Sequence, residues 1–404
     1  MSKRIKQKIK EFNGTAMKDR IYLDHAATTP VSPEVLDAMT ECMYDVWGNA
    51  SGVYGTGRDS RRAIDRARRQ VAEALGAQAK EIYFTGGGSE SDNWAIKGTA
   101  FAMKARGNHI ITTAIEHHAV LHTCEWLEKN GFRITYLQPD SEGFIHPAMV
   151  ENAVTEKTVL ISVMMANNEI GTLEPVAEIG KIAHKRGILF HTDAVQAFGA
   201  IPINVNQIQA DQLSLSAHKI YGPKGIGALY IREGTRIEPL IHGGAQERGL
   251  RAGTENVAGA VGLGIAAAAA IESQETDERK IRFLRDRLIK GILERIPDAY
   301  LNGSREKRLP NNCHFSFRGV ESESLLLRLD LVGIAASGGS ACTSGAPEAS
   351  HVLRAIGLPD DMSQGSIRMT VGKENTEEEI DEVLRILPDI VKDLRSMRKM
   401  TGGK

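Results

Sequence analysis

The order of apolar and polar positions divides the chain into two parts. Between about residues 80 and 231, short β-rich apolar runs alternate with helical patterns. This alternation is typical of a mostly parallel sheet that is covered by helices on both faces. Several runs show no polar alternation, as expected of strands that are buried on both sides. The expected strands are at 81–85, 109–113, 133–137, 158–165, 188–192, 212–215 and 226–231.

The pattern changes after about residue 276. A charged helical stretch over 278–294 is followed by strand-like runs at 314–317 and 367–371 and by a helix over 376–398. The fold class is therefore α/β, with a large domain built on a seven-stranded, mostly parallel sheet and a smaller α+β domain. We assign residues 35–276 to the large domain, 21–34 and 277–404 to the small domain, and 1–20 to a flexible N-terminal extension.

An apolar run over 258–271 is too short and too rich in glycine to span a bilayer, so we interpret it as a buried helix. The GxGxxA string at 262–267 follows no expected strand and indicates close helix packing instead of a dinucleotide loop. The first 20 residues contain no apolar segment of the kind found in secretory signals.

Composition excludes several classes of partner. The 404 residues carry 50 basic and 51 acidic side chains, a net charge of -1, so neither nucleic acid nor a membrane surface is expected as a partner. The four cysteines are widely spaced, without a zinc pair or a disulfide framework. This spacing indicates a reducing compartment, and we expect the protein to be cytoplasmic.

Polar residues follow five of the expected strands, at 85–90, 116–118, 167–169, 193–196 and 216–219. Ligands of parallel sheets bind beyond the carboxyl ends of the strands, so these segments are expected to share one site. The first contains the glycine-rich stretch Gly86–Ser89 before a helix expected over 91–102. Free backbone N–H groups and a helix N-terminus favour a phosphate there, and a plain turn is the alternative. The stretch lacks the spacing of a nucleotide-binding P-loop.

Lys219 follows the strand at 212–215 and precedes a glycine–proline turn. A lysine there forms a Schiff base if its surroundings lower the pKa of its ammonium group, whereas a solvated lysine is the plainer interpretation. Asp193, at the end of a neighbouring strand, favours the Schiff-base interpretation. Its carboxylate can hold the pyridinium nitrogen of pyridoxal phosphate (PLP) protonated, as that cofactor requires.

Seven segments, in order, resemble motifs of the NifS/IscS-type cysteine desulfurases, which are fold-type I PLP enzymes of the class-V aminotransferase family. The resemblance runs from about residue 21 to the end of the sequence. The segments are YLDHAATTP at 22–30, ESDN at 90–93, NNEIG at 167–171, HTDAVQ at 191–196, HKIYGPKG at 218–225, RAGTEN at 251–256 and GSACTSG at 339–345.

The resemblance implies a role for each matching residue. Lys219 resembles the Schiff-base lysine, and Asp193 resembles the partner of the pyridinium nitrogen. His117 is similar to the residue stacked on the cofactor ring. Arg368 resembles the planar donor that holds the substrate carboxylate, and Asn168 is implied as a second substrate contact. The other implied cofactor contacts are Asn168, Gln196, Gly88, Ser89, Ser216, His218 and, from the second subunit of a homodimer, Thr254.

Cys342 also acquires a role from the resemblance. It lies among small residues, where a thiol is expected to be mobile and exposed. The implied reaction removes sulfur from L-cysteine, leaves L-alanine and stores the sulfur as a persulfide on Cys342, with His117 as a candidate proton shuttle. The implied acceptor is an iron–sulfur scaffold or another sulfur-acceptor protein. No resident metal is expected, while a transient iron–sulfur ligand role for Cys342 stays open; Cys42, Cys124 and Cys313 are expected in the core.

Two alternatives remain at the level of sequence. One is a selenocysteine lyase, an aminotransferase or another PLP-dependent transferase of this fold, and an aminotransferase would not need Cys342. The other is a non-catalytic sulfur-transfer or scaffold protein, which would not need Lys219. The sequence also departs from the family pattern, with Ser89 in place of a threonine and Pro347–Ser350 in place of Leu-Glu-Pro-Ser. These changes affect loop dynamics and the choice of acceptor.

Overall fold

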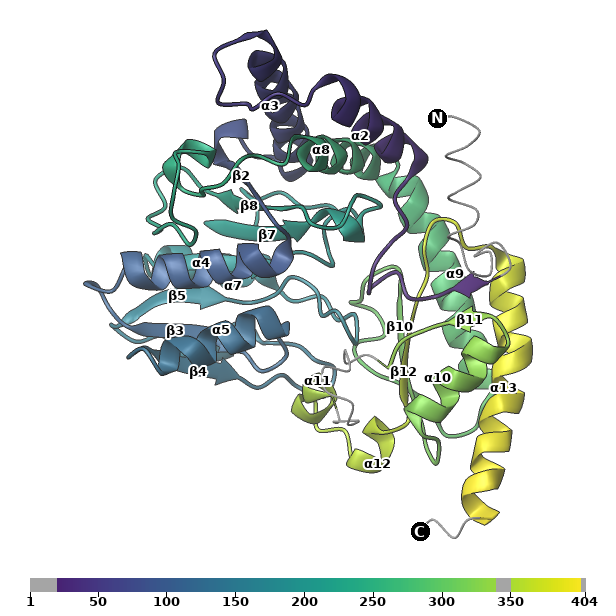
Figure 1. The fold of residues 1–404 in the computed structure, drawn as a ribbon. Coiled ribbons are helices and arrows are strands. Elements are labelled where there is room, and N and C mark those ends of the chain that lie inside the picture. The colour runs from purple at the N-terminus through teal and green to yellow at the C-terminus, as the bar shows by residue number, and fades with distance from the viewer. Residues whose placement is uncertain (1–19, 339–349, 401–404) are drawn as a thin grey trace.

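The computed structural model describes residues 20–338 and 350–400. Its larger part is built on one seven-stranded sheet (Figure 1). In spatial order the strands are β2 (Ile82–Thr85), β8 (Gly227–Ile231), β7 (Gln212–Ser216), β6 (Leu189–Asp193), β5 (Thr158–Ser162), β3 (His109–Thr113) and β4 (Arg133–Leu137).

This sheet is mostly parallel, as predicted. Strand β8 pairs antiparallel with both β2 and β7, and the other neighbouring pairs run parallel. All five residues of β3, β5, β7 and β8 are buried. Strands β5 and β8 show no polar alternation, as expected of strands covered on both faces, whereas β7 alternates as QLSLS and buries its polar residues as well. The edge strand β4 is buried only at its last residue.

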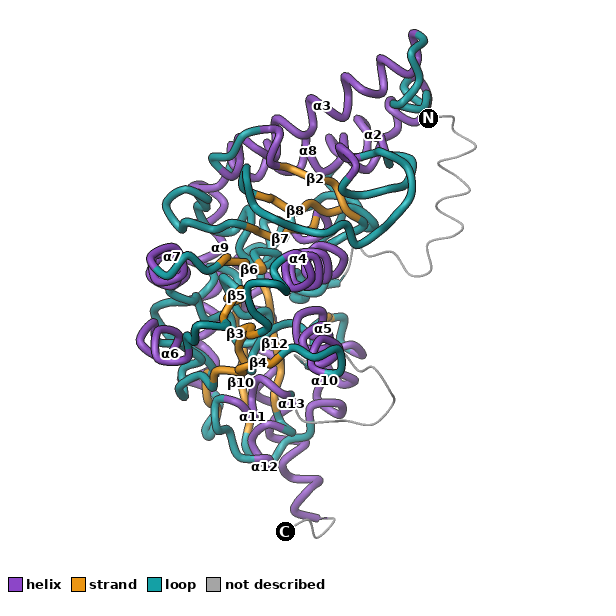
Figure 2. Tube along the Cα trace, turned by 90° about the vertical axis from the view of Figure 1, so that its left-hand side faces the viewer, coloured by secondary structure: helices purple, strands orange, loops and turns teal. Residues whose placement is uncertain are grey.

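Helices cover both faces of the sheet. Figure 2 shows the sheet between α4 (Gly88–Ala102) and α5 (His118–Glu128) on one side and α6 (Pro147–Ala153) and α7 (Val176–Lys185) on the other. Three further helices pack together beyond β2, namely α2 (Pro33–Asp45), α3 (Gly55–Leu75) and α8 (Val257–Glu272). A Cβ on Gly264 of α8 would lie 2.7 Å from Ala67 Cα, so glycine allows the close approach to α3. The predicted helix-packing role of the GxGxxA string is confirmed.

The C-terminal residues form a second group of elements with its own apolar core, called here the C-terminal unit. It contains an antiparallel sheet of β9 (Ala299–Leu301), β10 (Asn312–Phe317) and β12 (Ser366–Thr370), in the order β12-β10-β9. Helices α9 (Gln274–Arg295), α10 (Ser322–Leu331) and α13 (Glu377–Met400) pack on this unit, and α11 (His351–Ala355) and α12 (Asp360–Ser363) are short.

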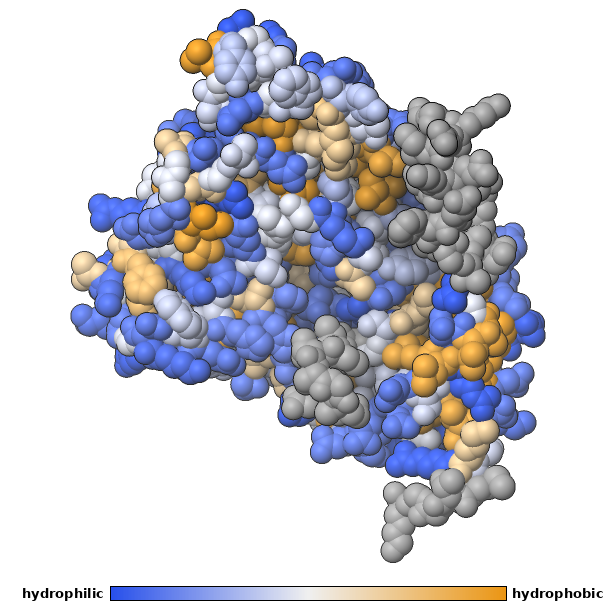
Figure 3. Space-filling model, in the orientation of Figure 1, coloured by the Kyte–Doolittle hydropathy of each residue, from blue (hydrophilic) through white to orange (hydrophobic). Residues whose placement is uncertain are grey.

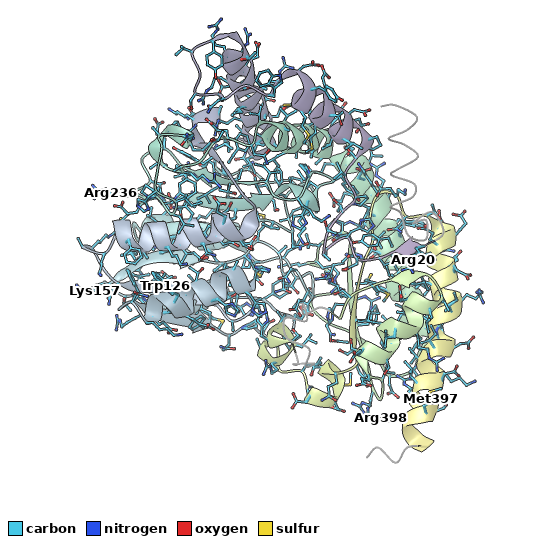
Figure 4. All side chains as sticks on the ribbon, viewed as in Figure 1. Arg20, Trp126, Lys157, Arg236, Met397 and Arg398 are labelled. Carbon is cyan, nitrogen blue, oxygen red and sulfur yellow. The ribbon has the colours of Figure 1, made fainter. Side chains whose placement is uncertain are left out.

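The start of the described chain joins this unit. Strand β1 (Ile21–Tyr22) pairs in parallel with β11 (Ile334–Ala335), and Leu23 is buried in the core of the unit. Figure 4 labels Arg20 at this entry point and Met397 near the far end of α13. The domain bounds expected from the sequence stay a prediction, and residues 1–19 of the expected extension lie outside the described residues.

No helix within residues 20–338 and 350–400 is by itself long and apolar enough to cross a bilayer. Helices α8 and α9 satisfy that criterion only as a pair, which is bent by 73°. Much of α8 is buried between its neighbours, Leu263 and Ala267 completely. The sequence-based interpretation of this run as a buried helix is therefore correct.

Candidate functional site

A cavity of about 350 Å³ opens at the carboxyl ends of β6 and β7, next to the C-terminal unit. Residues from nearly every expected strand end line it, together with Arg368 of β12. The sequence-predicted residues in its wall are Gly88, Ser89, His117, Asn168, Asp193, Gln196, Ser216, His218, Lys219 and Arg368. Side chains from segments far apart in the sequence therefore meet at one place, as the strand-end argument predicted.

One end of the cavity is a cradle at the N-terminus of α4. The helix begins at Gly88, three residues before the predicted start, because Gly87 takes a φ of 150° after β2 and turns the chain directly into the first helical turn. A Cβ on Gly88 would lie 2.7 Å from Val195 Cγ2, so a side chain there would close the cradle. The unpaired N–H groups of a first helical turn favour an anion, and Ser216 and His218 line the same cavity.

Lys219 lies in a single 3₁₀ turn, Ala217–Lys219, directly after β7. Its Nζ donates to the carbonyl oxygens of Ala26 and, at 2.8 Å, of Ala27. Burial lowers the pKa of Lys219 from 10.5 to about 8, with a further lowering by Arg368, while Asp24 and Asp193 act in the opposite direction. A lysine with this pKa has a substantial neutral fraction near physiological pH, which a nucleophilic amine requires.

Asp193 closes β6 and is only 7% exposed. Its Oδ1 accepts a hydrogen bond from Val195 N at 2.8 Å. Burial raises the pKa of Asp193 to about 6, although that hydrogen bond and the charge of Lys219 lower it. A cation placed in the cavity against this carboxyl would therefore stabilise its ionised form.

His117 is the N-cap residue of α5 and lines the cavity. Its Nδ1 accepts from Ala119 N at 3.1 Å, so in the neutral ring the proton lies on Nε2. Burial lowers the pKa of His117 to about 4, and the neighbouring His118 and Lys219 lower it further. The imidazole is therefore neutral at physiological pH and has one N–H to donate.

Arg368 is buried, with an exposed fraction of 5%, and is held from two sides. Its Nη1 donates to Asn168 O at 2.8 Å, and its Nη2 donates to Asp24 Oδ1 at 2.9 Å. Its backbone pairs with Ser337, which also lines the cavity. The Oδ1 atom of Asn168 is buried and has no hydrogen-bond partner among the described residues. The Arg368 guanidinium, a planar donor, and the Asn168 Oδ1 acceptor thus belong to residues that line the same cavity.

Two predicted site residues are not in this wall. Thr254 is exposed and does not line the cavity of its own chain. Cys342 lies outside the described residues. The described residues on either side of its segment, Ser337 and His351, both line the cavity. Ser350 Oγ donates to Glu169 Oε2 at 2.5 Å and caps α11 through Val352 N at 3.1 Å.

The remaining cysteines behave as core residues. Cys42, Cys124 and Cys313 are buried and unpaired. Burial raises the pKa of the Cys313 thiol to about 12 and that of the Cys124 thiol still further. The prediction that these three are structural is confirmed, and none is poised as a nucleophile.

Sequence reasoning assigned no role to several residues of the site. Asp24, Asp92 and Glu169 lie within motifs that carried the family resemblance, which was the available signal. His118 lies in the polar segment 116–118 that follows a predicted strand, whereas His351 had no such signal. The two rings meet only in the fold, with centroids 4.6 Å apart. All five line the cavity or contact a residue that does.

Comparisons with known proteins agree with this geometry. The model of the family "Aminotransferase class-V" matches residues 21–383. The chain is 54% identical over 383 residues to "Cysteine desulfurase IscS" of Clostridium botulinum, which covers 94% of this chain and 96% of that protein.

Among solved structures, a "NIFS-LIKE PROTEIN" is 39% identical with a TM-score of 0.87, covering 93% of this chain and all of that one. "SspA in complex with cysteine" is 38% identical with a TM-score of 0.78, covering 88% and 100%. On the strength of its fold, its cavity and these similarities, the chain belongs to the class-V aminotransferase family and, within it, to the cysteine desulfurases.

Proposed function

We propose that this protein uses PLP to remove sulfur from L-cysteine, releases L-alanine and passes the sulfur through a persulfide on Cys342. One observation carries the proposal: a single cavity gathers a lysine with a lowered pKa, a buried carboxyl and a buried arginine. The names of the relatives and the cysteine complex of a structural neighbour support it.

The described residues fit PLP by charge and shape. The α4 cradle favours a phosphate, and Asp193 in the wall of the same cavity favours a protonated ring nitrogen. The unpartnered Asn168 Oδ1 is an acceptor that a hydroxyl-bearing ring can satisfy. When bound, PLP supplies an aldehyde that reacts with amines and a ring that withdraws electrons from the substrate Cα.

The protein's own residues bind the substrate and hold the protons in this scheme. Neutral Lys219 is the amine for the aldehyde and, once free, a base for the substrate Cα proton. Arg368 binds the substrate carboxylate in place of its contact with Asp24. His117 Nε2 holds a proton beside the cavity. The Cys342 thiolate attacks the substrate sulfur, so that an S–S bond forms while the C–S bond breaks.

A homodimer accounts for an apolar surface around α2. Six large apolar side chains there are more than half exposed: Leu36, Met43, Tyr44, Trp47, Val53 and Tyr54. Exposed Asp37 and Glu41 lie on α2, whereas exposed Arg62 and Arg66 lie on α3, so a two-fold related copy can pair them. Exposed Thr254 is then available to the partner's cavity.

The acceptor of the sulfur is proposed to be a protein, such as an iron–sulfur scaffold, in the cytoplasm. A second group of exposed apolar side chains lies on the C-terminal unit. It consists of the exposed Leu327, Leu331 and Val332 at the end of α10. Figure 3 shows apolar surface in the region where Figure 1 labels α10.

Purified protein tests the proposal directly. Wild type is expected to show the visible absorption of lysine-bound PLP and to produce alanine from L-cysteine with persulfide at Cys342. Lys219→Ala should lose both, while Lys157→Ala, at an exposed lysine labelled in Figure 4, should lose neither. Cys342→Ala should stop persulfide formation and Cys42→Ala should not. A colourless wild type, or full alanine production by Cys342→Ala, would contradict the proposal.

A further inference from the structure

A chain of buried polar side chains lies behind Asp193, on the face of the sheet that α4 covers. His191 Nδ1 lies 2.9 Å from Ser162 Oγ, and His191 Nε2 lies 3.0 Å from Ser214 Oγ. The Ser214 side chain also hydrogen-bonds Asp92 on α4. All four of these residues are almost completely buried. Ser214 stands directly opposite Asp193 in the β6–β7 register, so the chain runs immediately behind that carboxyl.

The position of Asp92 creates an electrostatic problem. The titratable groups that face it are Asp193 and His191 of β6 and Glu116 after β3. Three buried carboxyl groups cannot all ionise at low cost in this setting. Lys219 is a cation that acts on one of these carboxyl groups, that of Asp193.

Hydrogen bonds decide which carboxyl carries the charge. Asp193 accepts from Val195 N and faces the cavity. Asp92 Oδ1 is buried with no hydrogen-bond partner among the described residues. The nearest ring nitrogen, His191 Nε2, is 3.7 Å away, and burial lowers the pKa of His191 to about 3, so the ring offers no positive charge. The charge therefore belongs on Asp193, and Asp92 keeps its proton.

We propose that Asp92 is a positioning residue that works as a neutral acid. Its carboxyl O–H donates to Ser214 Oγ, the Ser214 hydroxyl donates to His191 Nε2, and His191 Nδ1–H donates to Ser162 Oγ. This direction gives each hydrogen bond of the chain one donor and one acceptor with a neutral imidazole. It leaves Asp193 ionised and supported from behind, where a protonated ring nitrogen would bind.

The inference rests on the proposed function only where PLP is the probe. Infrared spectroscopy of the full-length protein without PLP tests it independently. Wild type should show protonated-carboxyl absorption at neutral pH, and Asp92→Asn should lose the part due to Asp92. Glu116→Gln is the matched control, because Glu116 is a second buried carboxyl with a raised pKa. This variant should lose a different part of the protonated-carboxyl absorption and keep the part due to Asp92. An unchanged spectrum in Asp92→Asn would overturn the proposal.

PLP affinity then separates a neutral acid from a carboxylate. Asp92→Ala breaks the chain and should weaken PLP binding about tenfold. Asp92→Asn is uncharged and can donate to Ser214, so it should restore affinity to within about threefold of wild type. Asp92→Asn binding as weakly as Asp92→Ala would refute the neutral-acid role. If Asp92→Ala does not fold, the infrared comparison with Asp92→Asn decides. Wild type that binds no PLP would refute the proposed function and leave the infrared test standing.

Discussion

Arg368 and Asp24 form a partly buried ion pair of 2.9 Å between segments that are 344 positions apart in the sequence. The Asp24 carboxylate therefore already accepts a hydrogen bond from the Arg368 guanidinium before substrate binds. Burial raises the pKa of Asp24, although Arg368 acts against this. An incoming carboxylate therefore competes with one that is already in place, and a planar donor can bridge both while the exchange occurs.

We expect Arg368→Lys to raise KM for L-cysteine by about tenfold or more and to change kcat much less, because a lysine cannot donate to Asn168 O and to a carboxylate in the fixed geometry of a guanidinium. Alanine release at varied L-cysteine concentration measures this. Arg385→Lys, at an exposed arginine paired with Glu382, is the control and should match wild type. An unchanged KM in Arg368→Lys would show that the carboxylate binds elsewhere.

The pKa of Lys219 predicts how PLP-free protein captures the cofactor. Only the neutral amine attacks an aldehyde, so the capture rate should rise with pH through about 8 instead of the usual 10.5. Stopped-flow absorbance at several pH values measures the midpoint. A midpoint near 10.5 would show that burial does not act on this lysine.

The same pKa predicts a change in stability. Between about pH 8 and 10.5 the unfolded chain binds a proton at Lys219 that the folded protein does not, so this group makes the free energy of unfolding rise with pH. Below that window the folded protein carries the full cost of a buried charge. Lys219→Met should therefore be more stable than wild type at neutral pH, by on the order of 1–3 kcal/mol, and the gain should shrink above pH 10. Urea unfolding without PLP measures both.

Ser350 joins the start of α11 to Glu169. Ser350→Ala removes the N-cap of α11 and leaves Glu169 buried without its donor, so we expect a loss of about 1–2 kcal/mol in the free energy of unfolding. Ser396→Ala, at an exposed serine that bonds its own helix, should cost far less. Equal unfolding curves for wild type and Ser350→Ala would argue against this anchor.

Thiol chemistry should distinguish Cys342 from the core cysteines. Burial raises the pKa of the Cys124 and Cys313 thiols, so iodoacetamide should leave both unmodified in the folded protein near pH 8. Both should react once urea unfolds the chain. Mass spectrometry of the alkylated peptides follows each site, with Cys342 expected to react first. Early alkylation of Cys124 in the native protein would contradict its core assignment.

The α2 surface predicts the oligomeric state. Trp47 is 72% exposed, and Trp47→Glu should convert a dimer into monomer because it puts a charge among apolar side chains. Sedimentation velocity measures the shift. Trp126→Glu, at another exposed tryptophan far from α2, is the matched control and should stay dimeric. A wild type that sediments as a monomer would remove the argument for the second copy.

Much of this protein was predictable because its signals are local. Short β-rich runs between helical patterns indicated the strands of the sheet, and β3 and β4 were predicted to the residue. The strand-end rule placed Lys219 and Asp193 at one site from the sequence alone, because the carboxyl ends of parallel strands meet at the same edge. The start of α4 was predicted three residues late, because the pattern does not show that Gly87 takes a φ of 150°.

What the tertiary structure alone decided concerns pairs that are distant in sequence. The contact of Arg368 with Asp24, the Ser350 anchor on Glu169 and the buried network around Asp92 depend on how the C-terminal unit and α4 pack on the sheet. The lowered pKa of Lys219 likewise follows from burial, which is a property of the packed interior. Local sequence determined which elements form and where chemistry gathers, whereas packing determined which charges those groups carry.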